Sequence, residues 1–317
     1  MSRFVVTGGG GFIGSNLVEA LLRRGEHVRA VDDFSTGRRA NLDAVAEWAR
    51  AGSGSFELLE GDLRDVAVCA AAVRDADFVL HKAAIPSVQR SVQDPIETND
   101  VNVRGTLQLL VAARDAKVRR FVFASSSSVY GESEVLPKVE TMPSAPISPY
   151  GLQKLAGEQY VLLFHRLYGL PTVALRYFNV FGPRQDPASD YAAVVPRFLD
   201  AVRSHKAPII YGDGEQTRDF TYVTNVVAAN LLACAGGAEV LGRAYNIACG
   251  QRISLNALLG ELGAIAGRTI VARHDPERPG DIRHSLAQID LAKELLGFTP
   301  SVTLREGLEK LWAEPAR

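Results

Sequence analysis

The stretch FVVTGGGGFIGS, residues 4–15, decides the fold. Its apolar residues form a short buried-strand pattern, and the glycines that follow precede a helical pattern that runs to Arg24 and closes at Gly25. A second apolar run ends at Asp32 and completes a strand–helix–strand unit of about 30 residues. Such a unit predicts a glycine loop and a helix N-terminus that receive a pyrophosphate.

The glycine spacing and the acid that follows it together indicate the cofactor. Residues 8–14 have the spacing G-x-x-G-x-x-G, which lets the backbone approach a dinucleotide closely. A carboxylate at Asp32 would bond both hydroxyls of a ribose and repel a 2′-phosphate. The pattern therefore favours NAD over NADP, although Arg38 and Arg39 lie close in sequence and leave NADP open.

Strand patterns alternate with helical patterns through the first two thirds of the chain. The further strands are expected near residues 56–59, 78–81, 121–124 and 173–176. This order predicts an α/β protein: a Rossmann-type doubly wound parallel sheet with a smaller C-terminal α/β substrate domain. Because ligands bind at the carboxyl ends of such strands, Asp62, Ala83, Ser126 and Phe178 should meet at one cleft. We expect the NAD-binding domain to comprise residues 1–178 plus about 226–247, and the substrate domain residues 179–225 and 248–317.

Composition excludes several classes of function. The 317 residues carry a net charge of −1, which argues against a nucleic-acid surface. The three cysteines and six histidines show no metal-ligand spacing, so we expect no metal site. No apolar run is long enough for a membrane span, and the first residues do not resemble a signal peptide. We expect a cytoplasmic protein with a small-molecule substrate.

Tyr150 and Lys154 are the residues that point most directly to catalysis. Residues four apart share one face of a helix, and an ammonium group favours the phenolate form of a tyrosine. We therefore expect a lowered pKa for Tyr150, which could then exchange a proton with a substrate hydroxyl. A run of serines, residues 125–128, lies about 20 residues earlier in the chain.

These motifs together resemble the extended short-chain dehydrogenase/reductase family, over essentially the whole chain. Within that family the chain looks like a nucleotide-sugar 4-epimerase. The motifs that carry this resemblance are residues 126–131 (SSSVYG), 148–151 (SPYG), 175–182 (LRYFNVFG), 217–220 (TRDF) and 278–281 (RPGD).

The resemblance implies a role for each catalytic residue. Tyr150 would act as general base on the sugar 4-hydroxyl, Lys154 would hold the nicotinamide ribose, and Ser126 would hydrogen-bond the reacting oxygen. Hydride would pass to NAD and return to the other face of a transient 4-keto sugar. Since no net oxidation occurs, NAD is expected to stay tightly bound.

The resemblance and the motifs also predict two further sets of binding residues. The expected cofactor-binding residues are Gly8, Gly11, Phe12, Ile13, Asp32, Asp33, Thr36, Gly37, Asp62, Leu63, Lys82, Ala83, Ala84, Asn102, Ser125, Tyr150, Lys154, Tyr177 and Phe178. The expected substrate-binding residues are Ser87, Ser126, Ser127, Ser128, Tyr150, Asn179, Ala193, Val194, Tyr211, Arg218, Arg278, Asp281 and Ser285. Among the latter, Arg218 and Arg278 would clamp the diphosphate and Tyr211 would stack on uracil.

Two positions bear on the sugar. Relatives confined to glucose and galactose nucleotides often carry a bulky tyrosine where this chain has Ser285, so a serine would leave room for an N-acetyl group. Relatives that epimerise UDP-glucuronic acid tend to carry a basic residue where this chain has Asp186, whose charge would repel a uronic acid. We therefore expect interconversion of UDP-N-acetylglucosamine and UDP-N-acetylgalactosamine, with UDP-glucose and UDP-galactose as a second pair.

Other outcomes on the same scaffold stay open. They are a UDP-glucuronic acid 4-epimerase, a nucleotide-sugar 4-ketoreductase, and a non-enzymatic NAD-sensing regulator. Decarboxylation and dehydration are disfavoured, because the acidic residues that those reactions use are missing from the serine loop. Apolar faces on the helices after Asn99 and after Ser148 predict a homodimer, although such faces also serve a monomer's own core.

Overall fold

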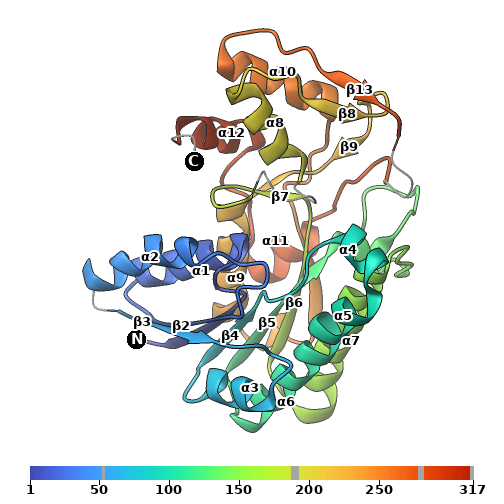
Figure 1. The fold of residues 1–317 in the computed structure, drawn as a ribbon. Helices are drawn as coiled ribbons and strands as arrows, with labels where there is room; N and C mark the ends of the chain where they lie inside the picture. Colours follow the sequence, from blue (N-terminus) through green and yellow to red (C-terminus); the bar gives the residue numbers. More distant parts are fainter. Residues whose placement is uncertain (52–53, 187–192, 278–281, 315–317) are drawn as a thin grey trace.

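A seven-stranded parallel sheet forms the centre of the computed structural model, which describes residues 1–51, 54–186, 193–277 and 282–314 (Figure 1). The strand order is β11-β6-β5-β4-β1-β2-β3. The strands are β1 (Arg3–Thr7), β2 (His27–Asp32), β3 (Ser55–Glu60), β4 (Phe78–His81), β5 (Arg120–Ser126), β6 (Thr172–Tyr177) and β11 (Arg243–Ile247). The order reverses at β1 and β4, which confirms the doubly wound sheet.

Helices cover both faces of the sheet. One face carries α1 (Phe12–Arg23), α2 (Arg39–Ala51), α9 (Val223–Ala235) and α11 (Asp290–Leu296). The other carries α3 (Val66–Val73), α6 (Thr106–Asp115) and α7 (Pro149–Tyr168), with α4 (Val88–Gln93), α5 (Pro95–Asn99) and a π-helical turn at Asp100–Gly105 beside them. In β1, Phe4 and Val6 enter the first core while Val5 enters the second, as the two-residue period of a strand requires.

The glycine loop after β1 allows no side chain at two positions. Gly8 has φ +66°, and a Cβ there would lie 2.7 Å from the backbone nitrogen of Ala83 at the end of β4. A Cβ on Gly14, in the first turn of α1, would lie 1.9 Å from the Gly8 carbonyl oxygen. These two glycines therefore bring the start of α1 directly against the strand ends, which is the geometry a pyrophosphate needs.

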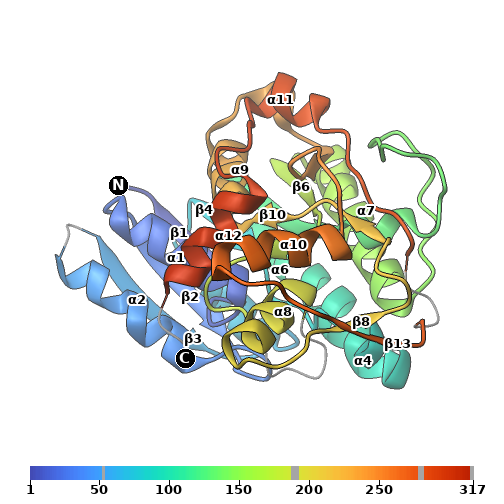
Figure 2. The same cartoon turned by 90° about the horizontal axis from the view of Figure 1, so that it is seen from above.

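The smaller domain begins at the carboxyl end of β6 and has its own core (Figures 1 and 2). Its helices are α8 (Val194–Arg203), α10 (Leu255–Ala266) and α12 (Leu304–Ala313). Its short strands pair as β7 (Val180–Phe181) with β10 (Thr221–Tyr222), β8 (Ile209–Tyr211) with β13 (Arg273–Asp275), and β9 (Thr217–Arg218) with β12 (Ile253–Ser254). Seen from above in Figure 2, α8 and α10 lie in front of the sheet.

The boundary between the domains differs from the expected one in the last third of the chain. β11 joins the sheet beside β6, within the returning segment expected at residues 226–247. Ala292, Leu296 and Phe298 also belong to the core of the large domain, although residues 248–317 were assigned to the substrate domain. The reason is that α11 packs against α9 and β11, a long-range contact that no local pattern reveals.

Helix α7 carries the tyrosine and lysine of the predicted pair. Ser148 caps its start by accepting a hydrogen bond from the Gly151 amide, Pro149 occupies the first turn, and Gly169 ends it with φ 68°. The amide of Tyr150 donates to Ser91 Oγ at 3.0 Å, which ties the start of α7 to α4. The tyrosine is thus held in the first turn of a long, well-capped helix.

Candidate active site

A cavity of about 970 Å³ lies at the carboxyl ends of the central strands. Most of the predicted cofactor residues line it: Gly8, Gly11, Phe12, Ile13, Asp32, Asp33, Thr36, Asp62, Leu63, Lys82, Ala83 and Ala84. Sequence reasoning did not single out Val31, Ser35, Gly61, Ile85, Pro86, Val101 or Ala124, which also line it. Most of those additional side chains are apolar or small, so only their position at the strand ends could have indicated them.

Asp32 occupies the place expected of the ribose-binding acid. Its carboxylate accepts hydrogen bonds from the amides of Gly10 and Phe34, both at 2.8 Å. Burial raises the pKa of Asp32, while these two amides act in the opposite direction. A Cβ on Gly37 would lie 2.7 Å from Asp32 Oδ1, so the loop fits closely around the carboxylate.

Arg38 and Arg39, the two arginines that could have bound the 2′-phosphate of NADP, both form ion pairs with carboxylates. Arg38 forms an ion pair with Asp186, and Arg39 forms one with Glu60. Arg39 also lies over the Phe34 ring, 4.2 Å from its centroid. A 2′-phosphate would therefore meet Asp32 and arginines whose charge is already compensated, an arrangement that favours NAD.

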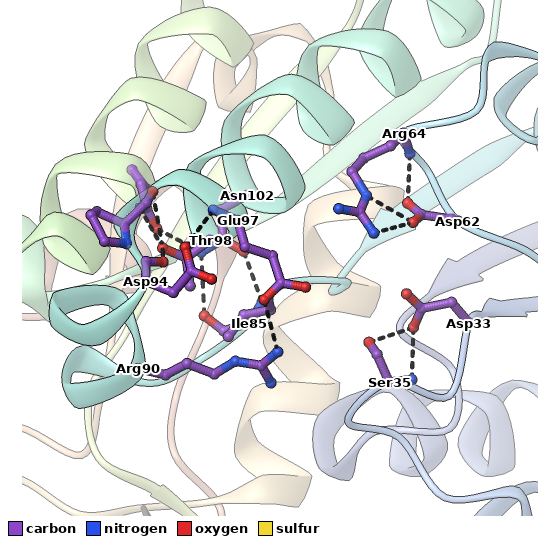
Figure 3. Close-up of polar contacts among 12 residues, drawn as sticks. Asp33, Ser35, Asp62, Arg64, Ile85, Arg90, Asp94, Glu97, Thr98 and Asn102 are labelled. Atoms are coloured by element: carbon purple, nitrogen blue, oxygen red, sulfur yellow. Dashed lines mark hydrogen bonds and ion pairs between the residues drawn. The ribbon is translucent and has the colours of Figure 1, made fainter.

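Two of the acidic residues that line this cavity make short local contacts (Figure 3). Asp33 accepts from the amide and hydroxyl of Ser35 at 3.0 and 2.7 Å. Asp62 accepts from the amide and the Nε of Arg64, both at 2.8 Å. Burial acts to raise the pKa of Asp62, but the hydrogen bonds from Arg64 outweigh it and hold that pKa below its usual value.

Asn102 supports the cavity wall from behind. Its amide exchanges hydrogen bonds with the backbone of Ile85, at 2.8 Å to the Ile85 nitrogen and 3.2 Å to its carbonyl (Figure 3). It also donates to Gln153 Oε1 at 2.8 Å, beside Lys154 in the chain. Asn102 thus links the backbone at Ile85 to the catalytic helix α7 through Gln153.

Tyr150, Ser126 and Lys154 come together at the end of β5. The Ser126 hydroxyl lies close enough to the Tyr150 phenol to favour its ionised form. Lys154 Nζ lies 5.9 Å from the centroid of the Tyr150 ring and donates to the Ala124 carbonyl at 2.9 Å. Two catalytic candidates thus face one another, with the ammonium one helical turn away.

The expected lowering of the Tyr150 pKa is wrong for the chain by itself. Burial raises that pKa to about 12, and the nearby Ser126 hydroxyl offsets only part of the effect. Burial also lowers the pKa of Lys154 to about 8. Tyr150 and Lys154 do lie one helical turn apart, as their spacing predicts. The Lys154 ammonium, however, donates to a carbonyl, and desolvation is the largest influence on the pKa of both residues.

The serine run is held by a buried polar network. Ser125 donates to Glu158 Oε2 at 2.6 Å, and Ser126 Oγ donates to Ser128 Oγ at 3.1 Å. Ser127 and Ser128 begin a 3-10 turn that extends to Tyr130. These contacts fix the backbone on which the Ser126 hydroxyl is carried.

Three other predicted residues are used partly by the protein itself. Ser87 is buried and caps α4 by accepting from the Arg90 amide at 3.0 Å. The Tyr177 hydroxyl bonds Lys82 and Asn230. The Phe178 ring is fully buried in a separate core, so a ligand could meet only its backbone.

A second cavity, of about 880 Å³, lies in the smaller domain. It brings together five of the predicted substrate residues: Asn179, Ala193, Val194, Tyr211 and Arg218. Sequence reasoning missed Arg197 and Gln216, which also line it. The Arg197 guanidinium lies 5.9 Å from the centroid of the Tyr211 ring.

Gln216 is the residue of this cavity that has an unused polar atom. Its Nε2 donates to the Tyr211 carbonyl at 2.7 Å, which fixes the orientation of the amide. Its Oε1 is buried and has no hydrogen-bond partner in the described part of the chain. Such a buried acceptor, on a residue that lines a ligand cavity, is a candidate to receive a hydrogen bond from a ligand or an ordered water.

Three further predicted substrate residues follow later in the chain. Arg278 and Asp281 lie outside the described residues. Ser285 is half-buried, and its amide donates to the Thr217 carbonyl at 3.0 Å, next to Arg218 in the chain. Asp186 pairs with Arg38, so the argument that its charge repels a uronic acid is weakened.

The parallel sheet, the glycine loop and the Ser126–Tyr150–Lys154 cluster define a dinucleotide-dependent enzyme of the short-chain dehydrogenase type. Residues 4–248 match the model of the NAD dependent epimerase/dehydratase family, and the chain belongs to that family. Its cofactor is accordingly NAD. The residues that line the cavity at the carboxyl ends of the central strands fit such a dinucleotide.

Known proteins resemble the chain over almost its whole length. A putative UDP-glucose 4-epimerase of Methanocaldococcus jannaschii is 38% identical over 308 residues, 97% of this chain and 96% of that protein. The structure of a UDP-N-acetylglucosamine 4-epimerase from Methanobrevibacter ruminantium M1, in complex with UDP-N-acetylmuramic acid, is 39% identical with a TM-score of 0.91, covering 98% and 97% of the two chains. A UDP-glucuronic acid 4-epimerase from Bacillus cereus, in complex with UDP-glucuronic acid and NAD, is 33% identical with a TM-score of 0.87, covering 97% and 96%.

The described ranges also bear on metal binding and on membrane insertion. No group of three or more histidine, cysteine or acidic side chains there is arranged to hold a metal ion. In the same ranges no helix has both the length and the apolar composition needed to cross a bilayer.

Proposed function

We propose that the protein is a UDP-sugar 4-epimerase that interconverts UDP-N-acetylglucosamine and UDP-N-acetylgalactosamine, with UDP-glucose and UDP-galactose as a second pair. The observation that carries the proposal is the placement of Ser126 and Lys154 beside Tyr150, next to a dinucleotide cavity. The three relatives named above are called UDP-sugar 4-epimerases, which supports the same reaction.

The residues of the chain account for the proton transfers. Tyr150 takes the proton from the sugar 4-hydroxyl and returns it after the sugar has turned, and the Ser126 hydroxyl bonds the reacting oxygen. Lys154, one helical turn from Tyr150, would hold the nicotinamide ribose. NAD, when bound, accepts and returns the hydride at carbon 4.

The second cavity suits a uridine diphosphate. The unpaired Gln216 Oε1 matches the N3–H donor of uracil, which adenine lacks, and the Tyr211 ring offers a stacking surface. Arg197 and Arg218 provide guanidinium groups for phosphate oxygens. A base acceptor and two cations in one cavity are the chemistry that a UDP group requires.

One sequence position and the name of one relative support the choice of sugar. A serine at position 285 leaves space that a tyrosine would fill, and the relative from Methanobrevibacter is named for an N-acetylated sugar nucleotide. The pairing of Asp186 with Arg38 favours UDP-glucuronic acid as the second candidate, because it removes most of the expected repulsion.

Product analysis by NMR tests the proposal. The purified protein is incubated, without added cofactor, with UDP-N-acetylglucosamine, UDP-glucose and UDP-glucuronic acid in separate reactions. We expect UDP-N-acetylgalactosamine as the main product and a slower formation of UDP-galactose. Conversion of UDP-glucuronic acid alone would show that the assignment of the sugar is wrong. A ketoreductase would instead give no product in these reactions and would oxidise added NADPH only when a 4-keto sugar nucleotide is supplied.

We also propose a homodimer formed through the helices beside the catalytic residues. Val92 on α4, Ile96 on α5 and Leu152 on α7 are exposed by 63%, 82% and 58%. These helices pack on one another, so a second copy could add its own helices to make a bundle. Light scattering should give twice the chain mass for the natural protein, and Ile96→Asp combined with Leu152→Asp should give a monomer.

A further inference from the structure

Lys82 is a charged residue on the inner wall of the cofactor cavity. It follows β4 directly, is half-buried and lines the cavity with Gly8 and Ala124. Its Nζ donates to the Tyr177 hydroxyl at 3.0 Å and reaches the Val122 carbonyl at 3.5 Å. Both partners are uncharged acceptors, so neither neutralises an ammonium group.

The catalytic Lys154 reaches the same strand, β5, from helix α7. Its Nζ donates to the carbonyl of Ala124, two residues after the Val122 carbonyl that Lys82 reaches. Ala124 itself lines the cofactor cavity. Within residues 1–51, 54–186, 193–277 and 282–314, no carboxylate forms an ion pair with either lysine. The two amines therefore reach neighbouring carbonyls of β5, and no carboxylate of the described residues compensates either of them.

The other groups around Lys82 are neutral. Tyr177 is hydrogen-bonded to Asn230 of α9, and burial raises the pKa of the nearby Cys234 thiol to about 12. His81, the preceding residue, is buried between Thr7 and Thr106. Thr106 already donates to the Asn102 carbonyl, so it accepts from His81 Nε2, and burial lowers the pKa of that imidazole. Any proton on Lys82 thus adds a charge that nothing adjacent cancels.

We propose that Lys82 tunes the bound cofactor toward its reduced form. Oxidised nicotinamide carries a positive charge, and like charges in a partly desolvated site repel one another. Reduction adds a hydride, with its two electrons, to carbon 4 of the ring and removes that charge, so a proton can then be held on the Lys82 amine. Burial and Lys154 both lower the pKa of Lys82 and make this proton uptake sensitive to the charge of the ring. The inference depends on NAD as the cofactor and not on which sugar is used.

Chemical reduction of the holoenzyme tests the inference without a sugar substrate. The NAD content of each variant is measured first, and an uncharged borane–amine reductant is then added while the absorbance of reduced nicotinamide at about 340 nm is followed. A neutral reductant is chosen because an anionic one would itself be attracted by the lysine. The reductant supplies the hydride and is itself oxidised.

Neutral and charged replacements of Lys82 should differ in the rate constant for reduction of the bound NAD. We expect Lys82→Gln and Lys82→Met to lower the rate constant of reduction by about tenfold, a change of roughly 1.4 kcal/mol. Lys82→Arg should stay within about threefold of the natural protein, because it keeps the charge. The control is Lys293→Gln, which removes a half-exposed lysine of α11 that does not line the cofactor cavity.

Three results would overturn the inference. The first is reduction of both neutral variants at the natural rate with a full complement of NAD. The second is an equal loss in Lys82→Arg and Lys82→Gln, which would show that packing matters and charge does not. The third is loss of NAD from both neutral variants, which would make Lys82 a cofactor-retaining residue. Failure of the sugar assay alone would leave this inference standing, because the readout is the cofactor.

Discussion

Replacing Glu158 by glutamine should destabilise the protein more than any exposed charge change. Glu158 and Arg176 form a buried pair with side chains exposed by 0% and 6%. Two hydrogen bonds join them, at 2.6 and 2.9 Å, and Ser125 donates a third at 2.6 Å. The pair lies between the catalytic helix α7 and the strands β5 and β6.

The size of the effect follows from burial. Removing one charge of a buried pair leaves the other uncompensated and typically costs about 3–5 kcal/mol of unfolding free energy. Arg176 would keep hydrogen bonds to the Tyr130 hydroxyl at 2.7 Å and to the Glu140 carbonyl at 3.3 Å, neither of which can balance its charge. At about 2 °C per kcal/mol for a chain of this size, we expect the unfolding temperature to fall by roughly 6–10 °C.

Thermal unfolding followed by circular dichroism gives the measurement, with Glu309→Gln as the matched control. Glu309 pairs with Arg305 at 3.0 Å, but the two side chains are exposed by 50% and 55%, so its loss should cost less than about 1 kcal/mol. A double replacement of Glu158 and Arg176 by methionine should be less destabilising than Glu158→Gln, because no unpaired charge remains. Equal shifts in Glu158→Gln and Glu309→Gln would refute the reasoning.

Three further outcomes can be checked directly. Tyr150→Phe should lower turnover by about 10²–10⁴-fold while NAD stays bound, whereas Tyr160→Phe on the same helix should leave the rate unchanged; initial rates and NAD content decide this. Lys154, with a pKa of about 8 in the folded chain and 10.5 as the ordinary value, binds fewer protons folded than unfolded between those values. The unfolding free energy of NAD-free protein in urea should therefore rise with pH between 8 and 10.5, and Lys154→Met should flatten that rise. Gln216→Leu should weaken UDP binding about tenfold by calorimetry, and an unchanged dissociation constant would remove Gln216 from the base site.

The cofactor half of the site could largely be predicted from the sequence. The glycine spacing over residues 8–14 and the acid at Asp32 depend on distances within one strand–helix–strand unit, and the cavity contains those residues. The pair Tyr150 and Lys154 is equally local, since the helical repeat alone places them on one face. Such short-range patterns can be interpreted from the sequence because the local backbone geometry determines the relative positions of the residues.

Other features depend on contacts between distant segments, which no local pattern contains. The pKa of Tyr150 rises because other elements bury the phenol, and the charge of Asp186 is compensated by Arg38, 148 residues away in the chain. Gln216 becomes a site residue only because folding buries its carbonyl oxygen in the second cavity. The sequence by itself determined the parallel sheet, the nucleotide loop and the catalytic pair, whereas desolvation and long-range pairing, which exist only in the folded chain, decided their electrostatics.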